Sequence, residues 1–257
     1  MKRFYLVLYG LAAYTLFNLS FVYLLGFLQG FGVPKGVNDG AVVGELQALG
    51  INLSLILLFG FFHSLMARDS FKHWWTRIVS KDAERPTYVL QSAVFLLIAM
   101  IHWQPMPQVI WHFEGIGEIA VLALFLVGVI TLLISTFLID HFELFGLKQV
   151  WYASREKNLP DDDFVQPWLY RIVRHPMQLG MVILLFSTPL MTVGHLVFAT
   201  AMTVYILIGL FFEERALLRR FGERYALYQR QVPMLVPGLK FRSARGTTAQ
   251  AEAGSIQ

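Results

Sequence analysis

The residues Arg174-His175-Pro176-Met177-Gln178-Leu179-Gly180 open the stretch that decides the fold of this chain, Tyr170 to Pro237. An apolar run follows them, and the chain becomes charged again at Glu213-Glu214-Arg215. The stretch then closes with aromatic and proline residues, namely Phe221, Tyr225, Tyr228, Pro233 and Pro237. Two charged clusters joined by a hydrophobic excursion predict that both clusters lie on the same side of a membrane.

The composition indicates an integral membrane protein. Of the 257 residues, 56% are hydrophobic and 15% are charged, which lies outside the range of soluble domains. Six apolar segments approach the roughly 20 residues that a helix needs to cross a bilayer, at about 4–29, 50–67, 87–104, 116–140, 177–192 and 195–213. The last two are short and closely spaced, which predicts a tight helical hairpin. We therefore expect an all-α, polytopic membrane helical bundle with five or six transmembrane helices.

The Lys and Arg residues distinguish the two sides of the membrane. The N-terminus has 2, the first four connections have 1, 5, 0 and 5, and the C-terminal region has 8. Because cytoplasmic segments are enriched in these residues, the alternation predicts that both termini lie in the cytoplasm. The net charge of +4 then reflects membrane sidedness, and we expect no nucleic-acid partner.

The sequence disfavours several kinds of chemistry. Cysteine is absent, which excludes disulfides, thiolate metal sites and a cysteine nucleophile. The seven histidines include no pair at the i, i+3 or i+4 spacing that presents two ligands from one helix, so we expect no metal site. The small and polar residues at 243–257 predict a disordered tail.

The Arg174-His175-Pro176 cluster has two interpretations. Pro176 suits the first turn of a helix, because the N–H that it lacks would have no partner there. A helix that begins at Pro176 presents its N-terminal amides to the cytoplasm, and with Arg174 and His175 it can hold a carboxylate or a phosphate. The alternative is a positively charged anchor at the start of a membrane helix.

Glu213 and Glu214 stand at the cytoplasmic end of an apolar helix. Two carboxylates are costly there unless they are solvated or serve a cation. One interpretation is a solvated helix end that pairs with neighbouring arginines. The other follows from the hairpin, which brings Glu213 and Glu214 beside Arg174 and His175. A site with one half for a carboxylate and one half for a cation suits S-adenosylmethionine.

The residues after this pair predict an amphipathic helix. Leu217, Phe221, Tyr225 and Tyr228 recur at steps of three and four residues, and the helix is expected to be broken at Gly222. Basic residues occupy its other faces. We expect this C-terminal helix to lie at the cytoplasmic surface of the membrane.

The whole C-terminal pattern resembles the membrane methyltransferases that modify isoprenylcysteine carboxyl groups and phospholipid amines. It covers about the last quarter of the chain and combines Arg174-His175-Pro176-x-x-x-Gly180, Glu213-Glu214, Phe221-Gly222, Tyr225 and Tyr228. The resemblance implies S-adenosylmethionine as cofactor. It implies that the helix start at Arg174, His175, Pro176 and Gly180 holds polar groups of the cofactor. Glu213 or Glu214 would bind its amino group, and Tyr225 and Tyr228 would close the pocket. Gln178 stands where the family often has Tyr, so the contact with cofactor or substrate is expected to differ there.

Four upstream segments, 63–68, 71–77, 84–88 and 140–149, resemble a bacterial family of methanethiol S-methyltransferases, which make dimethyl sulfide. They share features with membrane proteins associated with denitrification as well. The resemblance implies a small thiol substrate, a bacterial inner membrane and a cofactor contact at Gln149. It implies a single membrane domain at 1–242, with a four-helix scaffold at 1–140 and a cofactor-binding part at 141–242.

A thiol reacts as its thiolate, and a small alkanethiol is mostly protonated at neutral pH. A base or a positive environment should therefore assist the reaction. The candidate catalytic residues are His141, beside Asp140, and His63, each at the cytoplasmic end of a predicted span, together with Arg174. Taken singly, each histidine fits an ordinary residue of the membrane interface better than a base, but their predicted position on the same side as the Arg174 cluster favours a catalytic role somewhat.

The sequence thus predicts a methyltransferase that transfers a methyl group to methanethiol. Methylation of a lipid amine or of an isoprenylcysteine carboxyl group is the first alternative, and a reductase that uses NADPH on the same scaffold is a weaker one. A non-catalytic membrane protein that supports nitrogen-oxide metabolism is the alternative from another class. The presence of both the Arg174-His175-Pro176 and the Glu213-Glu214 clusters speaks against it.

Overall fold

A computed structural model describes residues 2–160 and 163–239 of the chain, and the predicted tail at 243–257 lies outside them. The described residues are mostly helical, as predicted. The helices are α1 (Lys2–Gln29), α2 (Glu45–Ala67), α3 (Asp69–Trp75), α4 (Lys81–His102), α5 (Ile116–Leu138), α6 (His141–Leu144), α7 (Leu147–Ser154), α8 (Pro176–Phe186), α9 (Val193–Phe221) and α10 (Glu223–Gln231). A 3-10 turn (Trp168–Arg171) and two strands, β1 (Val109–His112) and β2 (Leu190–Thr192), complete the described elements.

The six predicted apolar segments correspond to α1, α2, α4, α5, α8 and α9. Within the described residues, four helices are long and apolar enough to cross a membrane: α1 from Arg3, α2, α5 and α9. Helix α4 has 22 residues and carries its charged residues in its first turns. Helix α8 has 11 residues, about 16 Å at 1.5 Å per residue, and is shorter than the hydrocarbon core. The predicted helical membrane bundle is confirmed, but α8 does not cross a bilayer alone.

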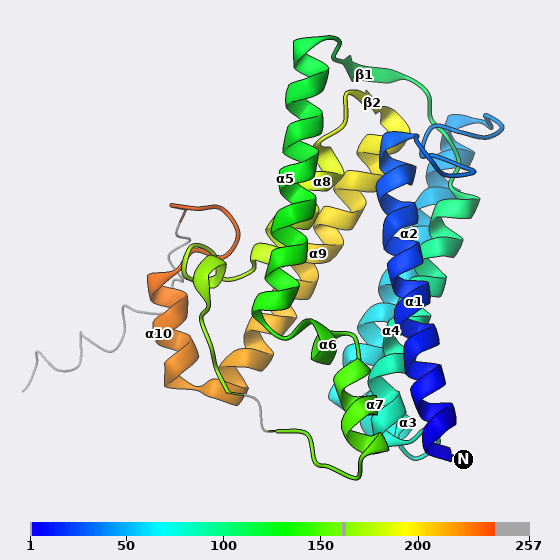
Figure 1. Ribbon diagram of the computed structural model, residues 1–257. Coiled ribbons are helices and arrows are strands. Elements are labelled where there is room, and N and C mark those ends of the chain that lie inside the picture. Colours follow the sequence, from blue (N-terminus) through cyan, green and yellow to red (C-terminus); the bar gives the residue numbers. More distant parts are fainter. Residues whose placement is uncertain (1, 161–162, 240–257) are drawn as a thin grey trace, which may run out of the picture.

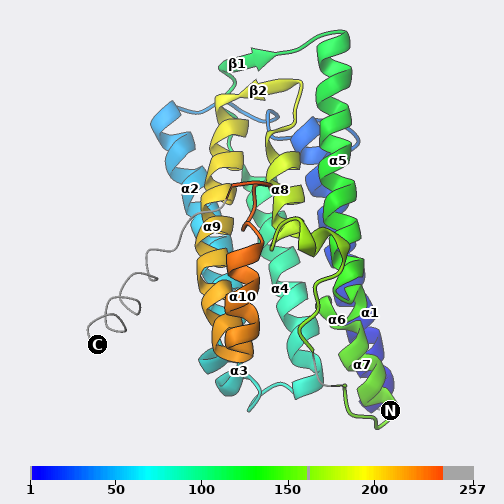
Figure 2. The same cartoon turned by 90° about the vertical axis from the view of Figure 1, so that its left-hand side faces the viewer.

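The long helices run along the bundle, and the short elements lie toward its two ends (Figure 1). The start of α1, together with α3, α6 and α7, lies at one end, and the two strands lie at the other. Turned by 90°, the molecule shows α10 folded back beside the last turns of α9, and α8 beginning part-way along α9 (Figure 2). The connections with many Lys and Arg residues and those with few therefore lie at opposite ends of the bundle, as the alternating counts predict.

A two-stranded antiparallel sheet joins β1 and β2, and the sequence analysis did not predict it. Val109 pairs with Thr192 and Trp111 with Met191. The sheet ties the third connection to the turn of the α8–α9 hairpin, so this turn is extended where a purely helical hairpin was expected. Val109, Ile110 and Trp111 are β-branched or aromatic residues, which favour extended backbone.

The main hydrophobic core lies toward the strand end of the bundle. Its largest buried side chains include Leu24, Phe27, Leu184 and Phe198, from the strand-side parts of α1, α8 and α9, and Trp103 directly after α4. A second, smaller buried cluster consists of Tyr225, Tyr228 and Val232 in and after α10. The helices are thus joined by one core at the strand end and by a separate cluster at the other end, and the polar residues of interest lie between them.

Helices α5 and α8 touch backbone to backbone at two glycines. A Cβ added to Gly128 would lie 2.8 Å from the amide nitrogen of Leu184, and one added to Gly180 would lie 2.7 Å from the carbonyl oxygen of Gly128. Such distances leave no room for a side chain. Gly180 therefore sets how closely α8 approaches α5, and this fixes the position of the helix start at Pro176.

Candidate functional site

Arg174 and His175 meet Glu214, as the predicted hairpin requires. Nε of Arg174 donates to Oε1 of Glu214 over 2.6 Å, and Nε2 of His175 lies 3.1 Å from the same oxygen. Nε2 of Gln229 donates to Oε2 over 3.1 Å. The Arg174, His175 and Glu214 side chains are 10%, 5% and 15% exposed, respectively. Both carboxylate oxygens of Glu214 are therefore occupied by donors of the protein itself.

The segment after α10 is fastened to the start of α8. The backbone N–H groups of Arg174 and His175 donate to the carbonyl oxygens of Pro233 (2.9 Å) and Met234 (3.1 Å). Nη1 of Arg174 donates to the carbonyl oxygens of Gln229 (3.1 Å) and Val232 (2.5 Å). Arg174 thus holds the C-terminal segment in place, and most of its donors are used within the protein.

Tyr225 and Tyr228 lie in the small core around α10, where they are 1% and 3% exposed. The Tyr225 hydroxyl donates to Oε1 of Glu214 over 3.5 Å, and the Tyr228 hydroxyl donates to the carbonyl oxygen of Tyr170 over 2.5 Å. Burial raises the pKa of Tyr228 to about 12, and burial, together with the Glu214 carboxylate, raises the pKa of Tyr225. Both tyrosines remain neutral donors that brace Glu214 and the 3-10 turn.

Glu213 has a different environment from its neighbour. Its side chain is exposed, whereas that of Glu214 is 15% exposed. It lies within electrostatic reach of His175 and Arg85. A Cβ added to Gly209, one helical turn earlier, would meet no atom within 4 Å. Glu213 is thus the exposed carboxylate of the pair, one helical turn from open space at Gly209.

Arg85 and Tyr88 of α4 lie within electrostatic reach of Glu213. The Arg85 guanidinium lies 5.2 Å from the centroid of the Tyr88 ring, and its Nε donates to the carbonyl oxygen of Leu144 over 2.8 Å. Tyr88 is half-buried and within electrostatic reach of Glu213. We use the recess as the name for the region around Gly209, Glu213, Arg85 and Tyr88.

His63 reaches the recess through Tyr88. Its Nε2 lies 2.6 Å from the Tyr88 hydroxyl, and its Nδ1 lies 2.8 Å from Oγ of Ser92. Its ring also stacks on Phe59 at 5.3 Å between centroids. His63 is therefore hydrogen-bonded to a residue that lies within electrostatic reach of Glu213.

His141 is placed elsewhere, between α1 and α5. Its Nε2 lies 2.8 Å from the Tyr14 hydroxyl, its Nδ1 lies 2.8 Å from Oγ1 of Thr136, and its ring stacks on Phe137 at 4.3 Å. It is 6% exposed, and burial lowers its pKa. Both ring nitrogens are engaged, so this geometry fits a residue that joins helices.

The remaining predicted residues lie in α7 and at the start of α8. Gln178, in the first turn of α8, is half-buried and has no hydrogen-bond partner among the described residues. Nε2 of Gln149 donates to the carbonyl oxygen of Glu143 over 3.0 Å, while its Oε1 is buried without a partner in the described part of the chain. Pro176 begins α8 as predicted, and Gly180 lies at the contact with α5.

The site residues predicted from the sequence do not include Arg85, Tyr88, Ser92 or Gln229. Arg85 and Tyr88 do belong to the upstream motif 84–88, so the signal was present without an assignable role. Gln229 carries no such signal, because its role depends on how α10 folds back on α9. No group of three His, Asp or Glu side chains in the described ranges is arranged to hold a metal ion.

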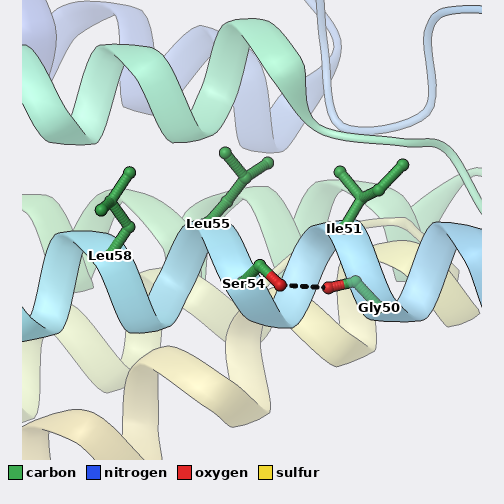
Figure 3. A pocket seen from close by; sticks show the side chains of 5 residues that line it. All are labelled: Gly50, Ile51, Ser54, Leu55 and Leu58. Carbon is green, nitrogen blue, oxygen red and sulfur yellow. Dashed lines mark hydrogen bonds between the residues drawn. The ribbon is translucent and has the colours of Figure 1, made fainter.

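Two hollows lie elsewhere on the surface. One is lined by Asp140 and Lys148 together with apolar residues of α1 and α7, and the other is apolar. Gly50, Ile51, Ser54, Leu55 and Leu58 line a shallow depression on α2, where Oγ of Ser54 donates to the carbonyl oxygen of Gly50 over 2.7 Å (Figure 3). No charged residue lines it. A ligand with an ammonium and a carboxylate group therefore fits the recess better than this depression.

Comparison with known proteins gives the family. The phospholipid methyltransferase family model matches residues 118–224. Methanethiol S-methyltransferase of Mycobacterium tuberculosis is 47% identical over 238 residues, covering 92% of this chain and 98% of that protein. Methanethiol S-methyltransferase 2 of Bradyrhizobium diazoefficiens is 43% identical over 92% of each chain. Methanethiol S-methyltransferase of Pseudomonas deceptionensis is 46% identical over 91% of this chain and 90% of its own. No solved structure is significantly similar.

These matches include the α2, α4 and α7 segments as well as the C-terminal pattern, since they extend over most of the chain. The chain is a membrane methyltransferase, and it belongs to the methanethiol S-methyltransferase family.

Proposed function

We propose that the protein transfers the methyl group of S-adenosylmethionine to methanethiol and so forms dimethyl sulfide, at the cytoplasmic end of the bundle. The observation that carries this proposal is the exposed carboxylate of Glu213, which lies within electrostatic reach of His175 and Arg85 while Glu214 is engaged by Arg174 and His175. The names and the extent of the relatives support the thiol as acceptor.

The residues at the recess fit the donor's polar groups. Glu213 is the carboxylate left accessible once Glu214 is engaged by Arg174, His175 and Gln229, so it suits the α-ammonium group. The first turn of α8 and the unpaired amide of Gln178 suit the carboxylate. The buried, unpartnered Oε1 of Gln149 is an acceptor that a ligand donor can satisfy. When bound, the donor supplies a methyl group on a positively charged sulfur.

The residues proposed for catalysis divide into two groups. Arg174 and Glu214 position the start of α8 against α9, since their polar atoms bind each other and the C-terminal segment. His63 and Arg85 are the basic side chains placed to act on a thiol, because both contact Tyr88. We assign His141 to the contact between α1 and α5.

The cytoplasmic placement rests on charge and on the arrangement of the elements. The connections rich in Lys and Arg lie at the end where α1 begins (Figure 1). The positive-inside rule assigns that end to the cytoplasm of a bacterial inner membrane. Methanethiol is small and apolar, so it can reach the recess from the bilayer.

Methylation of a phospholipid amine is the second candidate, because a phospholipid methyltransferase model matches residues 118–224. The methanethiol S-methyltransferase relatives match over most of the chain, including α2 and α4, which favours the thiol. Since the chain belongs to a methyltransferase family, the reductase and the non-catalytic alternatives are set aside.

Purified protein in lipid nanodiscs is supplied with methyl-labelled S-adenosylmethionine and either methanethiol, a phospholipid amine or an isoprenylcysteine analogue. We expect labelled dimethyl sulfide in the gas phase. Labelled lipid without dimethyl sulfide would refute the thiol assignment. The donor site is tested separately by calorimetry.

Glu213→Gln removes a charge-assisted hydrogen bond and should weaken donor binding about 10- to 100-fold, while the protein stays folded. Glu213→Asp is the matched variant, since it keeps the charge and should retain part of the affinity. Unchanged donor affinity in Glu213→Gln would show that the ammonium group binds elsewhere.

A further inference from the structure

The hydrogen bonds around His63 determine which atom donates and which accepts in the series Ser92, His63 and Tyr88. The Ser92 hydroxyl donates to the carbonyl oxygen of Tyr88 over 2.7 Å, so its proton is used. Oγ of Ser92 therefore accepts from Nδ1–H of His63. With Nδ1 protonated, Nε2 of the neutral imidazole accepts from the Tyr88 hydroxyl. The 2.6 Å separation in this last bond is short for a hydrogen bond between neutral groups.

Charged side chains lie near the hydrogen-bonded residues Ser92, His63 and Tyr88. Tyr88 is within electrostatic reach of Arg85 and Glu84 on its own helix, and of Tyr205 and Glu213 on α9. Ser64 of α2 lies 3.1 Å from the Tyr205 hydroxyl, so that hydroxyl is already engaged. Tyr88 thus combines a hydrogen bond to His63 with electrostatic reach to Glu213.

On the basis of the function proposed above, we propose that Tyr88 and His63 form a proton relay that deprotonates the thiol. The S–H bond of the thiol breaks, and its proton moves to Oη of Tyr88. The phenolic proton moves at the same time to Nε2 of His63, which leaves a thiolate and an imidazolium. Nε2–H then donates to Oη of Tyr88, and the new O–H of Tyr88 donates to the thiolate. No heavy atom has to move, because each hydrogen bond keeps its two partners.

Arg85 and Ser92 support the two ends of the relay. The guanidinium beside the Tyr88 ring stabilises negative charge on the thiolate. Oγ of Ser92 accepts from Nδ1–H of His63 before and after the transfer, so it keeps the ring in one orientation. Tyr88 is therefore a catalytic residue in this proposal, and Ser92 is a positioning residue.

The test compares two small thiols of different acidity, methanethiol and the more acidic 2,2,2-trifluoroethanethiol. Tyr88→Phe and His63→Gln should each lower methanethiol turnover about 100-fold, the usual contribution of proton transfer by a positioned side chain. Both should have little effect on trifluoroethanethiol when the assay is run above pH 8, where this thiol is mostly ionised and needs no relay while methanethiol is still mostly protonated. A residue that only supports the fold would lower turnover of both thiols equally.

The chain offers a matched control. His141 lies between the Tyr14 hydroxyl and Oγ1 of Thr136, the same arrangement as Tyr88, His63 and Ser92 but away from the recess. Tyr14→Phe should therefore leave the ratio of the two turnover rates at its wild-type value. A change in that ratio as large as the one in Tyr88→Phe would overturn the proposal.

Binding provides a readout that needs no methyl donor. Nuclear magnetic resonance of carbon-13 methanethiol should show about fivefold weaker binding to Tyr88→Phe, as expected for one lost hydrogen bond. Equal losses with both thiols in Tyr88→Phe and His63→Gln would refute the relay and leave the proposed function intact. No methylation of either thiol by the wild type would refute the proposed function and the relay with it. If Tyr88→Phe does not fold, His63→Gln decides between these results.

Discussion

Arg174 donates from Nε to Oε1 of Glu214 over 2.6 Å, and this bond joins the start of α8 to the end of α9. Because His175 and Gln229 also donate to Glu214, its carboxylate is fully used inside the protein. Glu213, the next residue, is left accessible in the recess. Two adjacent carboxylates thus have separate tasks, one that holds helices together and one that is available to a ligand.

Arg174→Ala should destabilise the protein by about 3 kcal/mol, because removal of one partner leaves a buried carboxylate without its counter-charge. Thermal unfolding in nanodiscs measures the effect. Arg171→Ala is the matched control, since Arg171 is exposed and its Nε donates to the carbonyl oxygen of Gln166. Equal stability of the two variants would show that the bond to Glu214 contributes nothing to the fold.

Gly180→Ala should destabilise the protein by about 1–3 kcal/mol, because its Cβ would meet the backbone of α5 and force the helices apart. The shift should also displace the start of α8 and weaken donor binding. Gly50→Ala is the control, since a Cβ there meets no atom within 4 Å. Gly180→Ala with wild-type stability would contradict the close contact between α5 and α8.

Gly209→Leu should leave the fold intact and lower donor affinity by at least about tenfold, or about 1.4 kcal/mol. The reason is that the open space next to Glu213 would be filled. Calorimetry measures the affinity, and Gly50→Leu, which fills the depression on α2, should leave it unchanged. Donor binding to Gly209→Leu with wild-type affinity would place the ligand away from this turn of α9.

Stability should decrease in mild acid, in part because of His141. Burial lowers its pKa from the ordinary value of 6.5. Below that pH the unfolded chain binds the proton more readily than the folded one does, so the stability contributed by the neutral ring is fully present above pH 6.5 and lost as the pH falls. His141→Gln should reduce the slope of melting temperature against pH between 7.5 and 5.5. Identical slopes for variant and wild type would exclude this contribution.

Much of the fold can be predicted from the sequence, because hydrophobic runs and charge counts are local signals. They locate the six apolar helices, the meeting of Arg174 and His175 with Glu214, and the break of the C-terminal helix at Gly222, whose φ is 56°. The β1–β2 pairing could not be predicted, because it joins segments some 80 residues apart with only a short extended signal. The length of α8 could not be predicted either, because its apolar run continues into strand β2.

The sequence by itself determined that this chain is a helical membrane protein with two polar clusters at one end. Both follow from the cost of placing charge and unpaired backbone in lipid. Only the tertiary structure decided which carboxylate is free, that Arg174 serves as a clamp, and that His63 reaches the recess while His141 does not. Neighbours in sequence point to different faces of a helix, so the partners that surround each side chain determine what it can do.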